Sequence, residues 1–145
     1  MNYLKNFCLS VTAAAAILGF GHAAQAQGAR VQVTGEIIDT FCSVSEVMFA
    51  SGSAHYQCAV WCAVGGIPVS IKDKNGDVYM ILRIEEDDTN VANPKLVTIQ
   101  AHEVTVDGDL FKRDGVNYIL VSKIATDKGL VTLTHDEHGI VPFGN

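Results

Sequence analysis

The chain has 145 residues, and its 16 acidic and 10 basic side chains give a formal net charge of −6 with neutral histidines. Binding to nucleic acid needs a positive face, so this acidic balance argues against a nucleic-acid-binding protein. The length is that of one domain with a single hydrophobic core.

The N-terminal residues have the three parts of a cleavable secretory signal peptide. Lys5 gives a positive start, an apolar run extends from Phe7 to Phe20, and Ala24-Gln25-Ala26 supplies the small residues that signal peptidase recognises. The run is shorter than the about 20 apolar residues that cross a bilayer. We therefore expect residues 1–26 to be a signal peptide, residues 27–145 to form one periplasmic or secreted domain, and no segment to span a membrane.

Five segments with strand-like composition follow, several of them rich in β-branched residues. In chain order they are Val31–Ile38, Ile67–Lys72, Val78–Ile84, Glu103–Lys112 and Val116–Ile124. Asn75-Gly76 favours a tight turn between the second and third strands, and a second hairpin is expected around Asp114-Gly115. After the fifth strand we expect a last short strand over Gly129–Thr134 and a loop from His135 onward.

Two short helices are expected between these strands. Ser53 is a good N-cap for a helix from about Ala54 to Ala63, inside an insertion between the first and second strands. Asn93-Pro94 predicts the start of a second helix, between the third and fourth strands. A five-stranded OB-type barrel has its helix at this second position. The expected fold class is therefore mainly β: a small OB-type barrel with a Cys/His-bearing helical insertion.

The insertion holds a histidine and three cysteines that could bind a metal ion. His55, Cys58 and Cys62 have the spacing i, i+3, i+7, which places them on one face of a helix. Cys42 lies in the preceding loop, which could fold back over that face. Three thiolates and an imidazole are a complete tetrahedral ligand set for zinc, and thiolate-rich sites also favour Cu(I). Met48, in the same insertion, is a further soft ligand to consider.

The same cysteines allow two other interpretations. Export favours disulfides, and a Cys42 bridge to Cys58 or Cys62 would leave one thiol over. A Cys58–Cys62 bridge would distort the helix, because Cβ atoms on that face are about 5–6 Å apart and a disulfide needs about 3.8 Å. Alternatively, a helix N-terminus and His55 could activate Cys58 for thiol redox chemistry.

Two other polar groups are weaker candidates. His135-Asp136-Glu137-His138 could bind a metal, but a solvated turn is the favoured interpretation. Asp39 follows the first strand, and nothing in the sequence brings a second carboxylate or a nucleophile next to it. The acidic run at residues 85–88 is expected to be a solvated loop.

Several of these segments together resemble a known protein family. TGEIID, a following cysteine, HYQCAVWC and GGIPVSI are similar to an uncharacterised family of exported bacterial proteins with the pattern TGE-(V/I)-(V/I)-D…C…H-x-x-C-A-x-x-C…G-x-P-V. The resemblance covers about Thr34–Val69, and the OB-like remainder agrees more loosely. It implies no reaction, but by matching position it points to four residues of interest: Cys42, His55, Cys58 and Cys62.

We therefore predict an exported, non-enzymatic protein that binds a soft metal ion, copper first and zinc second, through Cys42, His55, Cys58 and Cys62. An envelope protein is a further partner to consider. One alternative is a disulfide-stapled OB-type binding module for a protein or small-molecule partner. The other is a thiol redox protein.

Overall fold

The computed structural model describes residues 28–47, 50–88, 91–131 and 133–137. The predicted signal peptide and its cleavage site lie outside the described residues, as do Met48 and His138. Within the described residues, no helix has the length and apolar composition needed to cross a membrane.

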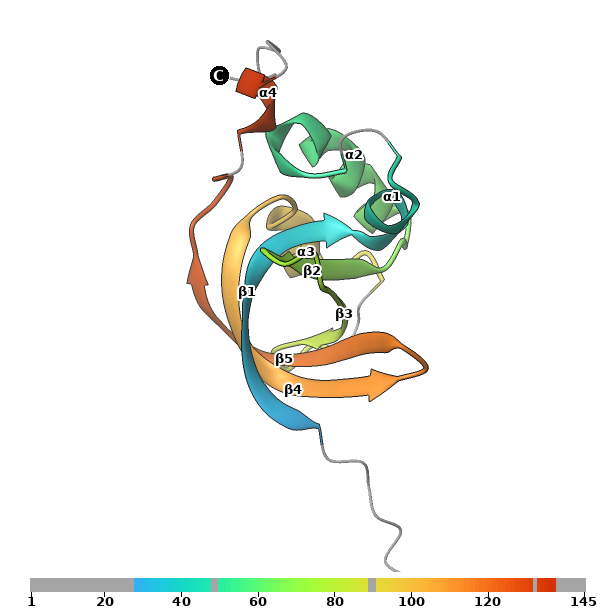
Figure 1. Ribbon diagram of the computed structural model, residues 1–145, viewed down its shortest axis with the longest axis vertical. Helices are drawn as coiled ribbons and strands as arrows, with labels where there is room; N and C mark the ends of the chain where they lie inside the picture. The colour runs from blue at the N-terminus through green and yellow to red at the C-terminus, as the bar shows by residue number, and fades with distance from the viewer. Residues whose placement is uncertain (1–27, 48–49, 89–90, 132, 138–145) are drawn as a thin grey trace, which may run out of the picture.

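Five strands close into a barrel, which Figure 1 shows from the side. The neighbour order around the barrel is β1-β2-β3-β5-β4, and β4 pairs back onto β1. The pair β3–β5 is parallel and the other described pairs are antiparallel. This order, with a helix between the third and fourth strands, confirms the predicted OB-type barrel. The strands are β1 (Ala29–Asp39), β2 (Val69–Asp73), β3 (Val78–Ile84), β4 (Glu103–Arg113) and β5 (Val116–Asp127).

The helices lie in the connections between strands and after the last strand of the chain. The insertion between β1 and β2 carries two short helices, α1 (Thr40–Ser45) and α2 (Gly52–Val64), whereas we had expected one helix preceded by a loop. Between β3 and β4, α3 (Pro94–Thr98) begins as predicted, because the Asn93 side chain accepts hydrogen bonds from the first free amides of the helix.

The bend of β1 directs its C-terminal end toward the insertion. Gly35 is opposite Asp73 of β2 on one side and Val104 of β4 on the other, so here β1 is paired with both of its neighbours. A Cβ atom on Gly35 would lie 2.3 Å from the carbonyl oxygen of Lys72, which is too close for any side chain, so only glycine fits here. This close approach lets one strand close the barrel and still end at Asp39, where α1 begins.

The barrel interior is filled by branched aliphatic side chains. Ala63 of α2 and Leu96 of α3 join the same cluster, so both helices pack against the barrel contents. The strand residues of this core are Val33, Ile37, Val69, Ile71, Ile81, Ile84, Val104, Val106, Ile119 and Val121. The insertion therefore rests on a rigid, close-packed support.

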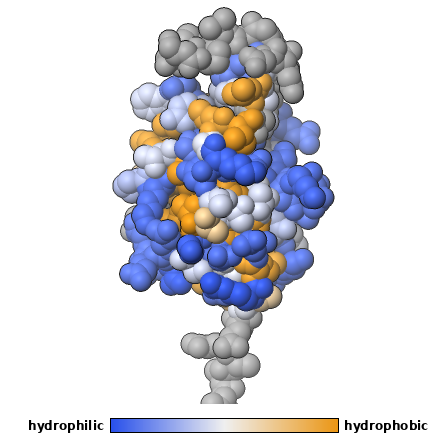
Figure 2. Space-filling view, turned by 90° about the vertical axis from the view of Figure 1, so that its left-hand side faces the viewer, coloured by the Kyte–Doolittle hydropathy of each residue, from blue (hydrophilic) through white to orange (hydrophobic). Residues whose placement is uncertain are grey.

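Two expectations for the C-terminal region were wrong. β5 continues to Asp127, and none of the described residues between 129 and 134 belongs to a strand. The segment after β5 instead ends in a short helix, α4 (Thr134–Glu137), which packs against α2. Figure 2 shows the face of the molecule that includes this segment, where hydrophobic patches lie between hydrophilic ones. Leu130, Val131 and Leu133, which follow β5 in the chain, are exposed.

Candidate metal centre

Asp39 joins the barrel to both helices of the insertion. It is the last residue of β1 and the N-cap of α1, and its side chain is fully buried. Oδ1 of Asp39 accepts a hydrogen bond from the backbone N–H of Cys42 at 2.8 Å. Oδ2 lies 2.6 Å from Nε2 of His55 on α2. A carboxylate at a helix N-terminus satisfies free amides, so Asp39 fixes the start of α1 and holds α2 beside it.

Three cysteine sulfurs meet between α1 and α2. Cys42 comes from α1, Cys58 and Cys62 lie one turn apart on α2, and the three Sγ atoms are within 4.8 Å of one another. Cys42 is buried, the other two are half-buried, and all three are free thiols. In a tetrahedral zinc site with Zn–S bonds of about 2.3 Å, the sulfurs are about 3.8 Å apart. Small side-chain rotations would therefore let this cluster hold a metal ion.

His55 belongs to a second, adjacent group of possible ligands. Ligand atoms of Asp39, Cys42 and His55 also lie within 4.8 Å of one another, so Cys42 is shared by both groups. Nε2 of His55 is bonded to Asp39, whereas Nδ1 is buried without a hydrogen-bond partner among the described residues. Metal-binding histidines commonly hold one ring nitrogen against a carboxylate and offer the other to the metal. Nδ1 is therefore the His55 atom that is available as a ligand.

The environment of the thiols favours their neutral form when no cation is present. Burial and then the nearby Asp39 carboxylate raise the pKa of Cys42 to about 12. The same two causes, in the same order, raise the pKa of Cys62 to about 11. No Lys or Arg occurs between Thr40 and Gly66 to compensate a thiolate. A bound metal ion would supply the positive charge that the protein does not.

The N-terminal end of α2 is held from two sides. Glu36 of β1 accepts a hydrogen bond from the backbone N–H of Gly52. Thr134 accepts one from the N–H of Ala54 at 3.1 Å, and the Nδ1 atom of His135 is hydrogen-bonded to the Ser53 hydroxyl. Ser53 therefore lies inside the first turn of α2. The N-cap is Ser51, so the prediction that Ser53 is the N-cap was wrong. These contacts fix the position of the helix that carries two of the three thiols.

The contact of His135 with Ser53 also corrects the interpretation of the C-terminal histidines. The His135 side chain is buried against α2, and so it does not belong to a solvated turn. The backbone N–H and the ring Nδ1 of His135 both contact the Ser53 hydroxyl, so His135 attaches α4 to the start of α2. The sequence could not show this, because its partner lies 82 residues away.

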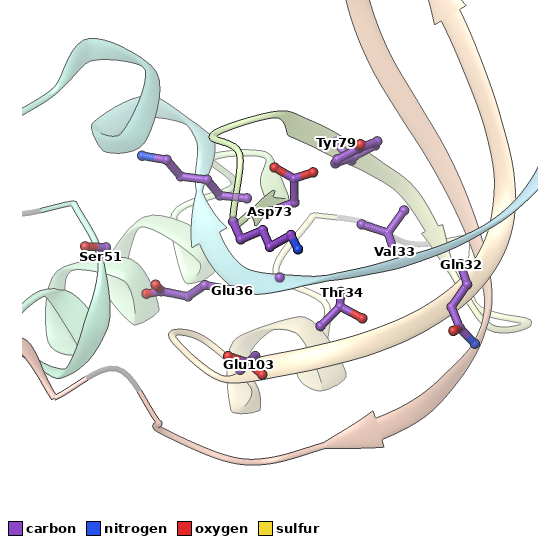
Figure 3. A pocket seen from close by; sticks show the side chains of 11 residues that line it. Gln32, Val33, Thr34, Glu36, Ser51, Asp73, Tyr79 and Glu103 are labelled. Carbon is purple, nitrogen blue, oxygen red and sulfur yellow. The ribbon is translucent and has the colours of Figure 1, made fainter.

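A separate pocket of about 670 Å³ lies along β1 (Figure 3). It runs from Gln32 and Thr34 past Glu36 toward Ser51 at the start of α2. Carboxylates and amines both line it, with Asp73 and Glu103 beside Lys72 and Lys74. Burial is the main cause that raises the pKa of Glu36. The pocket holds none of the three thiols, so it is distinct from the cysteine cluster.

The structure places the four predicted ligands as follows. His55, Cys58 and Cys62 all lie on α2, and Cys42 is within reach of them. The three thiols form one group of possible ligands. His55 belongs to a second group, which it forms with Asp39 and Cys42. The sequence does not predict a partner for Asp39, because its contact with His55 depends on how α2 folds back. One signal was available: Asp39 precedes Cys42 by three residues, which is the spacing of an N-cap bond.

Comparison with protein-family models, curated proteins and solved structures finds no match for the chain. The chemistry of the site is therefore inferred from its own geometry.

Proposed function

We propose that the protein binds a soft metal ion, Cu(I) or Zn²⁺, with Cys42, Cys58 and Cys62 as thiolate ligands. The observation that carries this proposal is the convergence of three sulfurs from two helices within 4.8 Å. Thiolates are the ligands that both ions prefer, and a three-sulfur set suits trigonal Cu(I) as well as tetrahedral zinc with one further ligand.

His55 is the proposed fourth ligand, through Nδ1. Its ring is 2 % exposed, and the Asp39 carboxylate fixes its orientation. If Nε2 carries the proton that Asp39 accepts, the lone pair of Nδ1 is free to bind a metal. Asp39 then acts as a positioning residue, because it also holds Cys42 through the backbone amide.

The geometry favours metal binding over the two alternatives. A redox thiol needs a lowered pKa, whereas burial and Asp39 raise the pKa of Cys42 and Cys62. Cys58 is the seventh residue of α2, beyond the first turn where a helix N-terminus would stabilise a thiolate. A disulfide would use two of the sulfurs and leave the third, so it would not explain why three converge.

The test is a competition titration of reduced, metal-free protein against a chromophoric chelator, with Zn²⁺ and with Cu(I). We expect one ion per chain, and Cys58→Ser or Cys62→Ser should lower the affinity at least about tenfold, because each removes a thiolate. Gln57→Ala is the matched control, since Gln57 is exposed on the same helix next to Cys58. Its affinity should equal that of the wild type. Equal affinities for wild type and both cysteine variants would contradict the proposal.

Export is a second part of the proposal. Lys5, the apolar run and Ala24-Gln25-Ala26 support a mature chain that begins at Gln27. Intact-mass measurement of protein from the periplasm should give that N-terminus, and a periplasmic species that retains Met1 would contradict it. Counting thiols in the same sample separates the alternatives: three that are protected only while metal is bound support the site, and one free thiol supports a structural disulfide.

A further inference from the structure

The first half of β1 is paired with another strand on one side only. Residues Ala29–Glu36 pair with β4, whereas the pairing of β1 with β2 begins at Gly35. Before Gly35, no strand among the described residues pairs with the other side of β1. A strand with an unpaired side offers a row of N–H and C=O groups to another backbone. We call this unpaired side of β1, before Gly35, the free edge.

The hydrogen bonds of Ile37 and Thr40 show which residues face the free edge. Ile37 donates through its N–H at 2.9 Å, and accepts through its C=O at 2.8 Å, on the side of β4. The N–H of Thr40 donates at 2.9 Å on the side of β2. Successive residues of a strand point their backbone groups to opposite sides, and the register of β1 with β4 has no shift. The N–H and C=O groups of Gln32 and Thr34 therefore face the free edge.

The side chains of Gln32 and Thr34 have partners on β4. Nε2 of Gln32 donates to the Asp107 carboxylate at 3.0 Å, and the Thr34 hydroxyl lies 2.8 Å from that of Thr105. In the part of the chain that the structure describes, no other segment bonds to the backbone groups of Gln32 and Thr34 on the free edge. These backbone groups are therefore available to a partner from outside the chain.

The pocket along β1 lies between the free edge and the β2–β3 hairpin. Figure 3 shows Asp73 and Tyr79 on the hairpin, beside the part of β1 that carries Val33. One residue of a strand occupies roughly 160 Å³, from a strand spacing of about 4.8 Å, a sheet spacing of about 10 Å and a rise of about 3.4 Å. The pocket volume of about 670 Å³ therefore accommodates about four extended residues.

We propose that the free edge binds an extended peptide segment of a partner protein, and that this segment carries an acidic side chain. Gln32 and Thr34 offer donors and acceptors that repeat with the spacing of a strand. Another extended backbone matches this pattern, whereas a compact small molecule does not. The bound segment would add a strand beside β1 and fill the pocket.

The charges of the pocket favour an acidic segment. The amines of Lys72 and Lys74 line the pocket, and neither forms an ion pair within the described residues. The carboxylates of the pocket already have partners. Glu36 and Asp73 accept hydrogen bonds from backbone amides, and Glu103 is paired with a lysine that follows β5. A carboxylate on the peptide would therefore meet two amines without a partner.

Amide hydrogen exchange measures whether the edge is free. The N–H groups of Gln32 and Thr34 should exchange close to the rate of an unfolded chain. Those of Val31 and Val33 point to β4 and should exchange at least about tenfold more slowly, so they are the control within the same strand. Equal protection of all four amides would overturn the proposal, because the edge would then already be covered.

The probe is the end-blocked peptide ETVEVTE, which combines strand-forming residues with carboxylates. At up to about 1 mM it should slow the exchange of the Gln32 and Thr34 amides at least about tenfold. A twin methylated on every backbone nitrogen keeps the side chains, loses all donors and should not bind. The basic peptide KTVKVTK should bind at least about tenfold more weakly. No slowing with ETVEVTE, or equal binding of either control peptide, would overturn the proposal.

Two variants test the two parts of the site. Thr34→Pro removes the N–H at the free edge but keeps the bond of Val33 to β4, so affinity for ETVEVTE should fall at least about tenfold. Unchanged protection of Val33 shows that this variant is folded. Lys74→Glu should weaken binding about two- to fivefold, and Lys112→Glu on the β4–β5 hairpin is its matched control. Wild-type affinity in either test variant would overturn the proposal.

Peptide binding goes beyond the proposed function and does not depend on it. The pocket contains none of the three thiols, so reduced, metal-free protein tests the free edge alone. Failure of the metal titration would leave these exchange measurements unaffected, and failure of the peptide to bind would leave the metal site unaffected. Protection of Gln32 and Thr34 that rises with protein concentration in the absence of peptide would overturn the proposal, because a second copy would then occupy the edge.

Discussion

Nε2 of His55 lies 2.6 Å from Oδ2 of Asp39, and both side chains are buried beside Cys42. This pair links the end of β1 to the helix that carries two thiols. It also decides which nitrogen of His55 is left for a metal ion. The contact therefore connects the fold to the chemistry of the site, and a change at Asp39 should affect metal affinity without removing a ligand.

Asp39→Asn should lower the metal affinity by about 10–100-fold, the usual effect of losing a carboxylate behind a ligating histidine. The asparagine oxygen can still accept from the Cys42 amide, but its NH₂ group would donate to Nε2 and move the ring proton to Nδ1. That proton would block the proposed ligand atom. Chelator competition at neutral pH measures the effect. Asp109→Asn, on the barrel surface, is the control, and an affinity of Asp39→Asn equal to the control would rule out the proposed role of the pair.

Metal binding at neutral pH should release at least two protons per ion. The pKa of Cys42 is raised to about 12 and that of Cys62 to about 11, so both thiols are protonated without metal. Each must lose its proton to become a ligand, and binding should therefore weaken as pH falls. Calorimetry in buffers of different ionisation enthalpy counts the protons. Release of fewer than one proton per ion would show that the thiols are not the ligands.

His135→Ala should destabilise the protein by about 1–3 kcal/mol, because the buried Ser53 hydroxyl would lose its ring partner and keep only the 3.4 Å contact with the backbone N–H of residue 135. The metal affinity of the folded variant should stay the same, since His135 belongs to neither ligand group. Urea denaturation of the metal-free protein gives the free energy of unfolding. His102→Ala is the control, because its pair with Asp127 is near the surface and contributes about 0–1 kcal/mol. Equal losses in the two variants would contradict a structural role for His135.

Glu36→Gln should change how stability depends on pH. Burial raises the pKa of Glu36 in the folded state, so the ionised carboxylate is disfavoured there. The stabilising contribution of the protonated form is present below the ordinary pKa and is lost as pH rises through the folded-state pKa. Glutamine keeps an oxygen for the Gly52 amide and does not ionise. Denaturation from about pH 4 to about pH 8 measures the free energy of unfolding, and the variant should gain stability relative to the wild type as the pH rises. Parallel plots of this free energy against pH would exclude the effect.

The barrel could be predicted because its signals are local. Strand composition, the Asn93-Pro94 helix start and the order of the five barrel strands are all read from neighbouring residues, and each agrees with the structure. The spacing of His55, Cys58 and Cys62 likewise placed them on one helix.

The remaining features depend on contacts between distant segments. The partner of Asp39 is 16 residues away, and the partner of His135 is 82 residues away. α1 was missed because its six residues have no clear period, and its N-cap bond to Asp39 is what defines it. Helices this short depend on capping and tertiary contacts more than on their own propensity.

X-ray absorption at the metal edge tests the central claim most directly, because it counts the atoms bound to the ion. Protein loaded with one Zn²⁺ per chain should show three sulfur neighbours at about 2.3 Å and one nitrogen at about 2.0 Å. His55→Ala should lose the nitrogen and keep the sulfurs. A shell of only nitrogen and oxygen atoms in the wild type would contradict a metal site built from Cys42, Cys58 and Cys62.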